Sequence, residues 1–130
     1  MEDSSKARMR GEMIVGVLES FRQHFQHVLD EYILTLFDEA ADDFQKVDPD
    51  PVKISKVLER LNTEWQEVCH SPNRIAEAEA DECFLINATF SDLLKLAKDV
   101  NSKEVDDAVF ERDLHRCIDH VQTLRQLRHH

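Results

Sequence analysis

The pattern of apolar positions in the first half of the chain predicts one long helix over residues 12–47. Apolar residues recur there in steps of three and four, the spacing that gathers them on one face of an α-helix, and this apolar stripe shifts by half a turn near Leu29. Gly16 is the only glycine of the stretch, which has no proline. Such a helix is about 50 Å long, whereas a compact chain of this size has a radius of gyration of about 14 Å. We therefore expect a rod-shaped bundle, or a protein that a partner completes.

Proline-containing segments mark the next two helices. Asp50 is a capping residue, and the proline after it suits a first helical turn, which predicts a second helix over 51–70. Ser71 and the proline after it repeat this pattern and predict a third helix over about 73–100. The second half of the third helix is apolar on more than one side, so we expect it to form the centre of the core. These core residues are Cys83, Phe84, Ile86, Phe90, Leu93, Leu94, Ala97 and Val100.

The last helix is predicted to begin after Ser102, which suits an N-cap and is followed by acidic residues in the opening turns. Its apolar residues are spaced 4, 3, 4 and 3, which is the seam of a coiled coil over two heptads. The seam consists of Phe110, Leu114, Cys117, Val121 and Leu124.

The fold class predicted from these patterns is all-α. We expect an elongated antiparallel helical bundle of about four helices, the last of which leads into a coiled coil. Residues 1–11 are polar and lack periodicity, so they are predicted to be disordered. Residues 12–101 form the predicted helical head domain, and 102–130 the C-terminal helix with coiled-coil character.

Composition and charge narrow the classes of partner. The formal net charge is −11, and an acidic balance argues against direct nucleic-acid binding, which relies on basic side chains. We expect no signal peptide and no membrane span, because no apolar run approaches the length of about 20 residues that a bilayer requires. The three cysteines are widely spaced on predicted apolar faces, so buried thiols in a reducing compartment are expected. These observations favour a protein of the nucleus or the cytoplasm.

One set of side chains has the residue types of a metal site. His24, His27 and Glu31 share a helix face, and Glu67 stands three residues before His70, as in the Glu-x-x-His motifs of di-iron bundles. That architecture needs two such motifs, and the two histidines at 115 and 120 lack the matching glutamate. We therefore expect no metal and no other cofactor, and a His/Glu metal-binding bundle is an alternative interpretation.

Signatures of catalysis are missing as well. The cysteines form no C-x-x-C pair, and none of the seven histidines stands in the His-x-x-Lys-Gly motif of phosphorelay domains. Two glycines in 130 residues leave no room for a glycine-rich phosphate loop. The sequence therefore predicts a protein that is not an enzyme and has no small-molecule substrate.

The apolar surplus at the ends of the long helices predicts a protein-binding surface, because a rod leaves its ends uncovered. The predicted partner-binding residues are Phe21, Phe25, Phe110, Leu114, Val121 and Leu124. We expect the partner to be another helical subunit, with hetero-association favoured over a homodimer.

The order of three segments resembles a known family. Phe37 and Phe44 close the long first helix, the next helix ends in TEWQE at 63–67, and INATFSDLLKLAK follows at 86–98. This order is similar to the polyamine-modulated-factor subunit of the kinetochore MIND complex, over residues 14–127. Ile86 and the asparagine after it stand for the family's leucine-Asn pair. The family's Cys-Phe-Pro signature is absent, with Asp43 and Phe44 in its place.

The resemblance implies a non-catalytic subunit that pairs with a second helical subunit in a kinetochore linker complex. Such a pair bridges centromeric chromatin proteins and the microtubule-binding machinery during chromosome segregation in mitosis, which implies a nuclear location at the kinetochore. The alternative from the residues alone is a stand-alone cytosolic helical-bundle adaptor.

Overall fold

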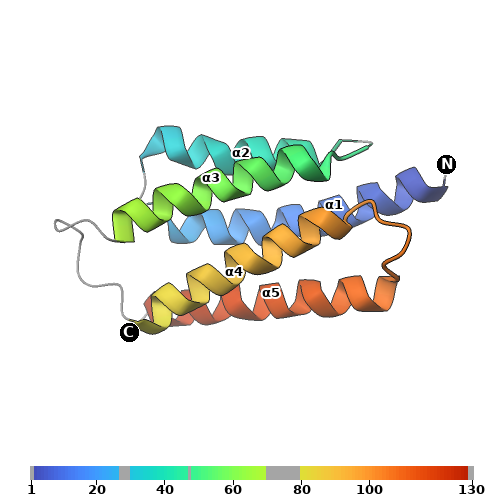
Figure 1. Ribbon diagram of the computed structural model, residues 1–130. Coiled ribbons are helices and arrows are strands. Elements are labelled where there is room, and N and C mark those ends of the chain that lie inside the picture. The colour runs from blue at the N-terminus through green and yellow to red at the C-terminus, as the bar shows by residue number, and fades with distance from the viewer. Residues whose placement is uncertain (1, 27–29, 47, 70–79, 129–130) are drawn as a thin grey trace.

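The computed structural model of the chain is built from α-helices (Figure 1). It describes residues 2–26, 30–46, 48–69 and 80–128. Within these residues it contains five helices and no strand. The helices are α1 (Glu2–His24), α2 (Glu31–Phe44), α3 (Pro51–Cys69), α4 (Ala80–Asp99) and α5 (Asp107–Arg128). The predicted all-α fold class is confirmed.

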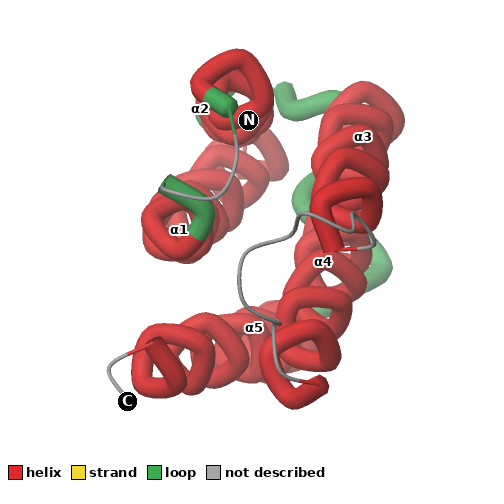
Figure 2. Tube along the Cα trace, turned by 90° about the vertical axis from the view of Figure 1, so that its left-hand side faces the viewer, coloured by secondary structure: helices red, strands yellow, loops and turns green. Residues whose placement is uncertain are grey.

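The helices pack side by side, and consecutive helices run in opposite directions (Figure 1). Each helix contacts the next one along the chain, and α1 also contacts α5. Viewed along the helices, the five elements surround one common interior (Figure 2). Because the chain reverses four times between α1 and α5, these two helices run parallel to each other where they meet.

The prediction of one helix over 12–47 is wrong. Helix α1 ends at His24, α2 begins at Glu31, and the two pack against each other. The reversal brings Phe21 and Phe25 against Phe37, with ring centroids 5.9 and 5.8 Å apart. A single straight helix would keep these rings apart and leave the second half of the apolar stripe in water, which is unfavourable. The half-turn shift of the apolar stripe in the sequence was the visible sign of this break.

The expectation of disorder over residues 1–11 also differs from the structure, in which α1 begins at Glu2. The ordering comes from tertiary contacts rather than from periodicity. Ala7 and Arg10 are 3% and 4% exposed, and Gly11 lies directly against the main chain of Phe44. These polar or small residues pack because the end of α2 and the α4–α5 connection lie beside them.

The start of α3 is as predicted. Pro51 is its first residue, and the Asp50 carboxylate accepts a hydrogen bond from the Val52 amide at 3.0 Å. The Ser71 cap, and the predicted extension of the neighbouring helices over 70–79, lie outside the described residues.

The last helix begins at Asp107, not after Ser102. The N-cap is Asp106, whose carboxylate accepts a hydrogen bond from the Val109 amide at 2.9 Å. Ser102 lies instead in the α4–α5 connection, where its carbonyl accepts a hydrogen bond from the Arg10 guanidinium at 3.2 Å. A carbonyl held by Arg10 in this way fixes the connection outside the helix.

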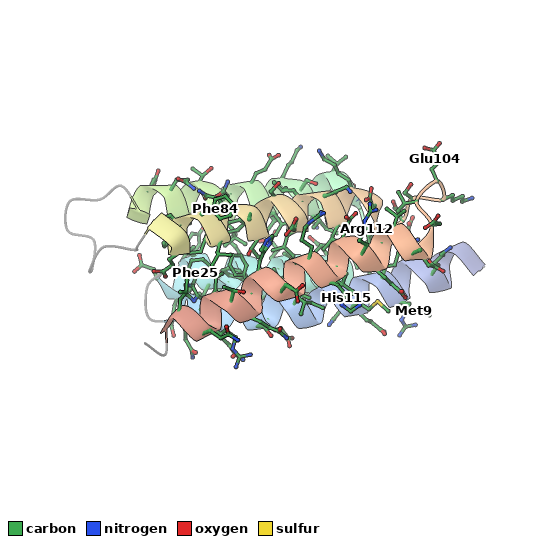
Figure 3. The ribbon with its side chains drawn as sticks, turned by 90° about the horizontal axis from the view of Figure 1, so that it is seen from below. Met9, Phe25, Phe84, Glu104, Arg112 and His115 are labelled. Carbon is green, nitrogen blue, oxygen red and sulfur yellow. The ribbon has the colours of Figure 1, made fainter. Side chains whose placement is uncertain are left out.

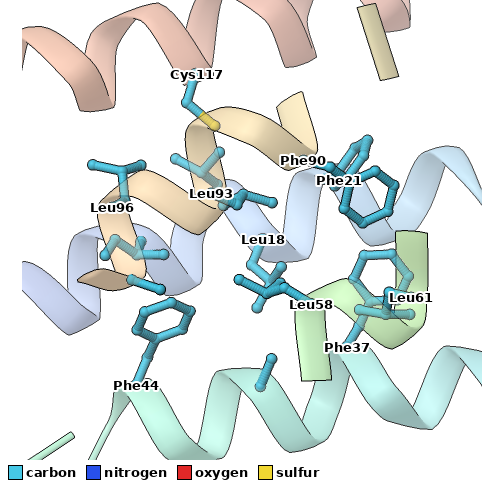
Figure 4. Packing of buried hydrophobic residues seen from close by; sticks show 14 of the residues in the cluster. Leu18, Phe21, Phe37, Phe44, Leu58, Leu61, Phe90, Leu93, Leu96 and Cys117 are labelled. Carbon is cyan, nitrogen blue, oxygen red and sulfur yellow. The ribbon is translucent and has the colours of Figure 1, made fainter. Parts of the chain in front are cut away.

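The core draws side chains from all five helices (Figure 4). It includes Leu18 from α1, Phe37 from α2, Leu58 from α3, Phe90 from α4 and Cys117 from α5. The predicted centre in the second half of the third helix is correct for Ile86, Phe90, Leu93, Ala97 and Val100, which are all buried. Cys83 and Leu94 are only partly buried and pack against this core.

Phe84 is an exception among the predicted core residues, because 69% of its surface is exposed (Figure 3). It stands two residues before the fully buried Ile86. Two residues correspond to about 200° around an α-helix, so Phe84 lies on the face of α4 opposite the core stripe.

Candidate protein-binding groove

The six predicted partner-binding residues all lie in the interior. Phe21 and Phe25 are fully buried and stack edge to face with ring centroids 5.0 Å apart. Phe21 lies at the same distance from Phe90, and Phe25 is 5.3 Å from Trp65. These rings hold α1 against α3 and α4. Contact between either phenylalanine and a partner would require the bundle to open.

The seam of α5 faces the same interior. Phe110, Leu114, Val121 and Leu124 are at most 6% exposed. They pack with the rest of the core, and the fully buried Cys117 lies between them on the same face. The apolar side chains at heptad spacing are therefore covered by other helices of the same chain. Val121 alone among the six also lines an open groove on the surface.

This groove runs between α1 and α5 and has a volume of about 280 Å³. Its wall on α1 consists of Met13, Gly16, Val17 and Ser20, and its wall on α5 of Ile118, Val121, Gln122 and Arg125. Gly16 and Ser20 stand one turn apart on the same face of α1. Because one has no side chain and the other a short one, the surface is hollow there.

Methionines extend the apolar surface along α1. Met9 and Met13 are 57% and 39% exposed, and with Gly16 they follow the spacing of one helix face. In Figure 3, Met9 lies at the outer edge of the molecule where α1 and α5 run together. Flexible thioether side chains of this kind adapt to the shape of a bound surface.

Two charges border the groove without a partner in the described part of the chain. Arg125 lines the groove on α5. Glu19 is exposed on α1 three residues after Gly16, so it lies on the helix surface beside the groove and not in its lining. Neither forms an ion pair with another described residue. Glu12, on the same face of α1, forms only an exposed pair with Arg8, with nitrogen and oxygen 3.6 Å apart. The groove therefore has an acidic side and a basic side.

The two glycines of the chain differ in what surrounds them. A glycine inside a helix destabilises it by about 1 kcal/mol relative to alanine. Gly11 has a packing reason, because a Cβ at this position would collide with the Phe44 carbonyl. At Gly16 a Cβ would meet no atom within 4 Å. Packing within the chain thus explains Gly11 but not Gly16.

A cluster of charged side chains lies between α4 and α5. Asp92 accepts hydrogen bonds from Arg116 at 3.0 Å and pairs with His120 at 2.7 Å. Asp113 accepts from Lys95 at 2.7 Å and from Arg116 at 3.0 Å. Both oxygens of each carboxylate are thus engaged by neighbours, so the cluster joins the two helices and leaves little capacity for a ligand.

The pKa values in this cluster follow from its geometry. Burial by itself would raise the pKa of Asp113, but the hydrogen bond from Lys95 and the charges of Lys95, Arg116 and Arg112 lower it overall. The hydrogen bond to Asp92 raises the pKa of Arg116. Both groups are therefore charged at neutral pH, which keeps the salt bridges intact.

Cys117 directly follows Arg116 of this cluster on α5 and is fully buried. Burial, and the nearby charge of Asp92, raise the pKa of its thiol to about 12. A thiol with this pKa is protonated at neutral pH, and the thiolate is the nucleophilic form. Cys117 is therefore a core residue and not an activated nucleophile.

Two of the candidate metal ligands in the described part of the chain, His24 and Glu31, lie on different helices, α1 and α2. His24 is buried and its Nε2 lies 2.9 Å from a carboxylate oxygen of Glu82 on α4. Glu31 opens α2 after the chain reversal, while His27 and His70 lie outside the described residues. Within the part of the chain that is described, no three His, Cys, Asp or Glu side chains are placed to hold a metal ion.

Sequence reasoning missed the groove because it depends on which helices are neighbours. The contact between α1 and α5 joins residues about one hundred positions apart, and no local pattern encodes it. The methionines and Gly16 were the available signals, but Met9 falls in the stretch predicted to be disordered, and Gly16 was noted only as the single glycine of a long helix.

None of the helices in the described residues is long and apolar enough to span a membrane. Comparison with known proteins found no family model, no curated protein and no solved structure that matches this chain.

Proposed function

We propose that the chain is a non-catalytic helical subunit that works by binding another helical protein. The observation that carries this proposal is the apolar groove between α1 and α5, which Met9 and Met13 extend along the surface. Apolar surface that is gathered in one place, rather than scattered singly, is typical of a protein-binding site.

The chemistry of the buried polar groups supports a non-catalytic role. Asp92 and Asp113 already bind cations of the same chain, and the Cys117 thiol is protonated at neutral pH. The partner is proposed to be a protein rather than a nucleic acid, because a net charge of −11 repels phosphates. No cofactor and no small-molecule substrate form part of the proposal.

In its most specific form, the proposal places the chain in a kinetochore linker complex of the nucleus, acting in chromosome segregation. This form rests on the resemblance of the segments at 63–67 and 86–98 to the polyamine-modulated-factor subunit. It includes an elongated bundle whose last helix leads into a coiled coil. Because the seam of α5 is covered within the chain, a coiled coil through that seam requires α5 to leave the bundle.

The second candidate function is a stand-alone helical adaptor. The covered seam of α5 favours it, because a bundle that satisfies its own heptads needs no obligate partner to fold. The two candidates differ in whether a stoichiometric partner accompanies the protein in the cell.

Affinity purification from dividing cells, followed by mass spectrometry and size-exclusion chromatography with light scattering, tests the proposal. We expect a second, predominantly helical protein to co-purify in stoichiometric amount. For the kinetochore form, fluorescence microscopy should place both proteins at centromeres. A monomer that purifies without a stoichiometric partner contradicts the subunit proposal and favours the stand-alone adaptor.

A further inference from the structure

We propose that the α1–α5 groove binds one amphipathic α-helix of another protein. That helix places an apolar side chain over Gly16, a carboxylate beside Arg125 and a basic side chain beside Glu19. This inference rests on the proposed function, and it specifies the contact site and the chemistry of the partner.

The surroundings of Gly16 are the first observation. Helices disfavour interior glycine, and the packing of this chain does not require one here, because a Cβ at Gly16 would have open space around it. Glycine does permit another backbone or a bulky side chain to come close to the helix. At Gly11 the approaching backbone is that of Phe44. At Gly16 no atom lies within 4 Å of a Cβ, which leaves room for an element of another protein.

The shape of the groove selects its occupant. At about 280 Å³ and open to solvent, it lies just below the range of about 300–1,000 Å³ that is usual for small-molecule sites. It suits one or two side chains of a helix, the arrangement in which apolar residues at i, i+3, i+4 and i+7 occupy a groove. A second copy that used the same surface would set one hollow against another, which leaves a void.

The charges at the border select the flanks of that helix. Arg125 stands on the α5 side and Glu19 on the α1 side, and neither has an ion-pair partner among the described residues. A partner helix with an acidic residue on one flank and a basic residue on the other satisfies both. Opposed charges of this kind fix the orientation of a bound helix and discriminate against wrong partners.

The test uses site-specific photo-crosslinking of the full chain in the cells that naturally produce it. A p-benzoylphenylalanine is incorporated at position 122, where Gln122 lines the groove. A second version carries it at position 39, where Glu39 is exposed on α2. The cross-linked peptide of the adduct is then sequenced by mass spectrometry. Gly16→Leu fills the groove, and Thr63→Leu places the same side chain on the exposed face of α3 as the matched control.

We expect an adduct from position 122, but not from position 39, to a segment of another protein with apolar residues at helical spacing and acidic and basic flanks. Gly16→Leu should reduce this adduct at least tenfold, Arg125→Glu should reduce it severalfold, and Thr63→Leu should leave it unchanged. The proposal is overturned by an adduct to a second copy, by a segment without helical apolar spacing, by no adduct, or by an adduct that survives Gly16→Leu.

Failure of this inference is distinguishable from failure of the proposed function. If the stoichiometric partner still co-purifies with the Gly16→Leu variant, the chain is a subunit that binds through another surface. If the unaltered chain neither cross-links at position 122 nor co-purifies with a partner, both proposals fail together.

Discussion

Gly11 of α1 lies directly against the carbonyl of Phe44 at the end of α2, so the two helices approach each other there without an intervening side chain. The contact fixes how α1 and α2 cross, and it places the buried residues Ala7 and Arg10 against the rest of the molecule. It also shows why a glycine is required inside a helix at this position.

Gly11→Ala is expected to destabilise the protein by about 1–3 kcal/mol, because the new methyl group meets main-chain atoms that move only with the whole helix. The measurement is the free energy of unfolding from urea titration. Gly16→Ala is the matched control, and it should stabilise the protein by up to about 1 kcal/mol, since its Cβ has open space. Equal effects at the two glycines would contradict this account of the α1–α2 contact.

Charges placed in the α5 seam should unfold the whole bundle. In the double variant Leu114→Asp and Val121→Asp, two carboxylates enter positions that are 6% and 3% exposed, each at a cost of several kcal/mol if it stays ionised. We expect the cooperative thermal transition to disappear. The double variant His115→Asp and Gln126→Asp adds charges at exposed positions of the same helix and should melt almost as the parent does. If the double variant keeps its cooperative thermal transition but no longer binds a partner, the seam binds the partner, as predicted from the sequence.

Arg10 joins α1 to the α4–α5 connection. Its guanidinium donates hydrogen bonds to the carbonyls of Asp99, Ser102 and Val105, at 3.0, 3.2 and 2.7 Å, and lies over the Phe110 ring at 4.8 Å. Arg10→Met should therefore cost about 3 kcal/mol, since it leaves three partly buried carbonyl acceptors without their hydrogen-bond donor.

The readouts for Arg10→Met are thermal unfolding and amide hydrogen exchange. Protection should fall first at the start of α1 and in the connection before Asp107. Arg8→Met removes an exposed cation that pairs with Glu12 and serves as the control, with an expected effect of about 0–1 kcal/mol. Unchanged exchange at both ends would refute the role assigned to Arg10.

Asp113 is expected to contribute to the pH dependence of stability. Its pKa in the folded state lies below the ordinary value of 3.8, so the unfolded state takes up the proton first as the pH falls. The stabilisation is therefore present above pH 4 and is lost progressively as the pH falls through the folded-state pKa. Asp113→Asn should reduce the loss of unfolding free energy that urea titrations measure between pH 6 and pH 3. Asp119→Asn alters an exposed carboxylate of the same helix. It should leave the pH dependence of the unfolding free energy as steep as in the unaltered protein.

The amino-acid sequence by itself determined the helical class of this protein and the start of α3. Periodic apolar spacing specifies helices locally, and Asp50 with Pro51 is a complete capping signal within a few residues. The same local reasoning correctly selected Ile86, Phe90 and Leu93 as core residues.

The tertiary structure decided where the chain reverses and which apolar faces stay covered. The break before α2 is stabilised by contacts of Phe21 and Phe25 with Phe37, and the order of residues 2–11 depends on partners such as Phe44 and Val105 far along the chain. Burial of the α5 seam and the open groove beside Gly16 follow from the same long-range contacts. Local spacing shows that a helix has an apolar face, but only the packing of distant helices determines whether that face is covered by the chain itself or stays open to another molecule.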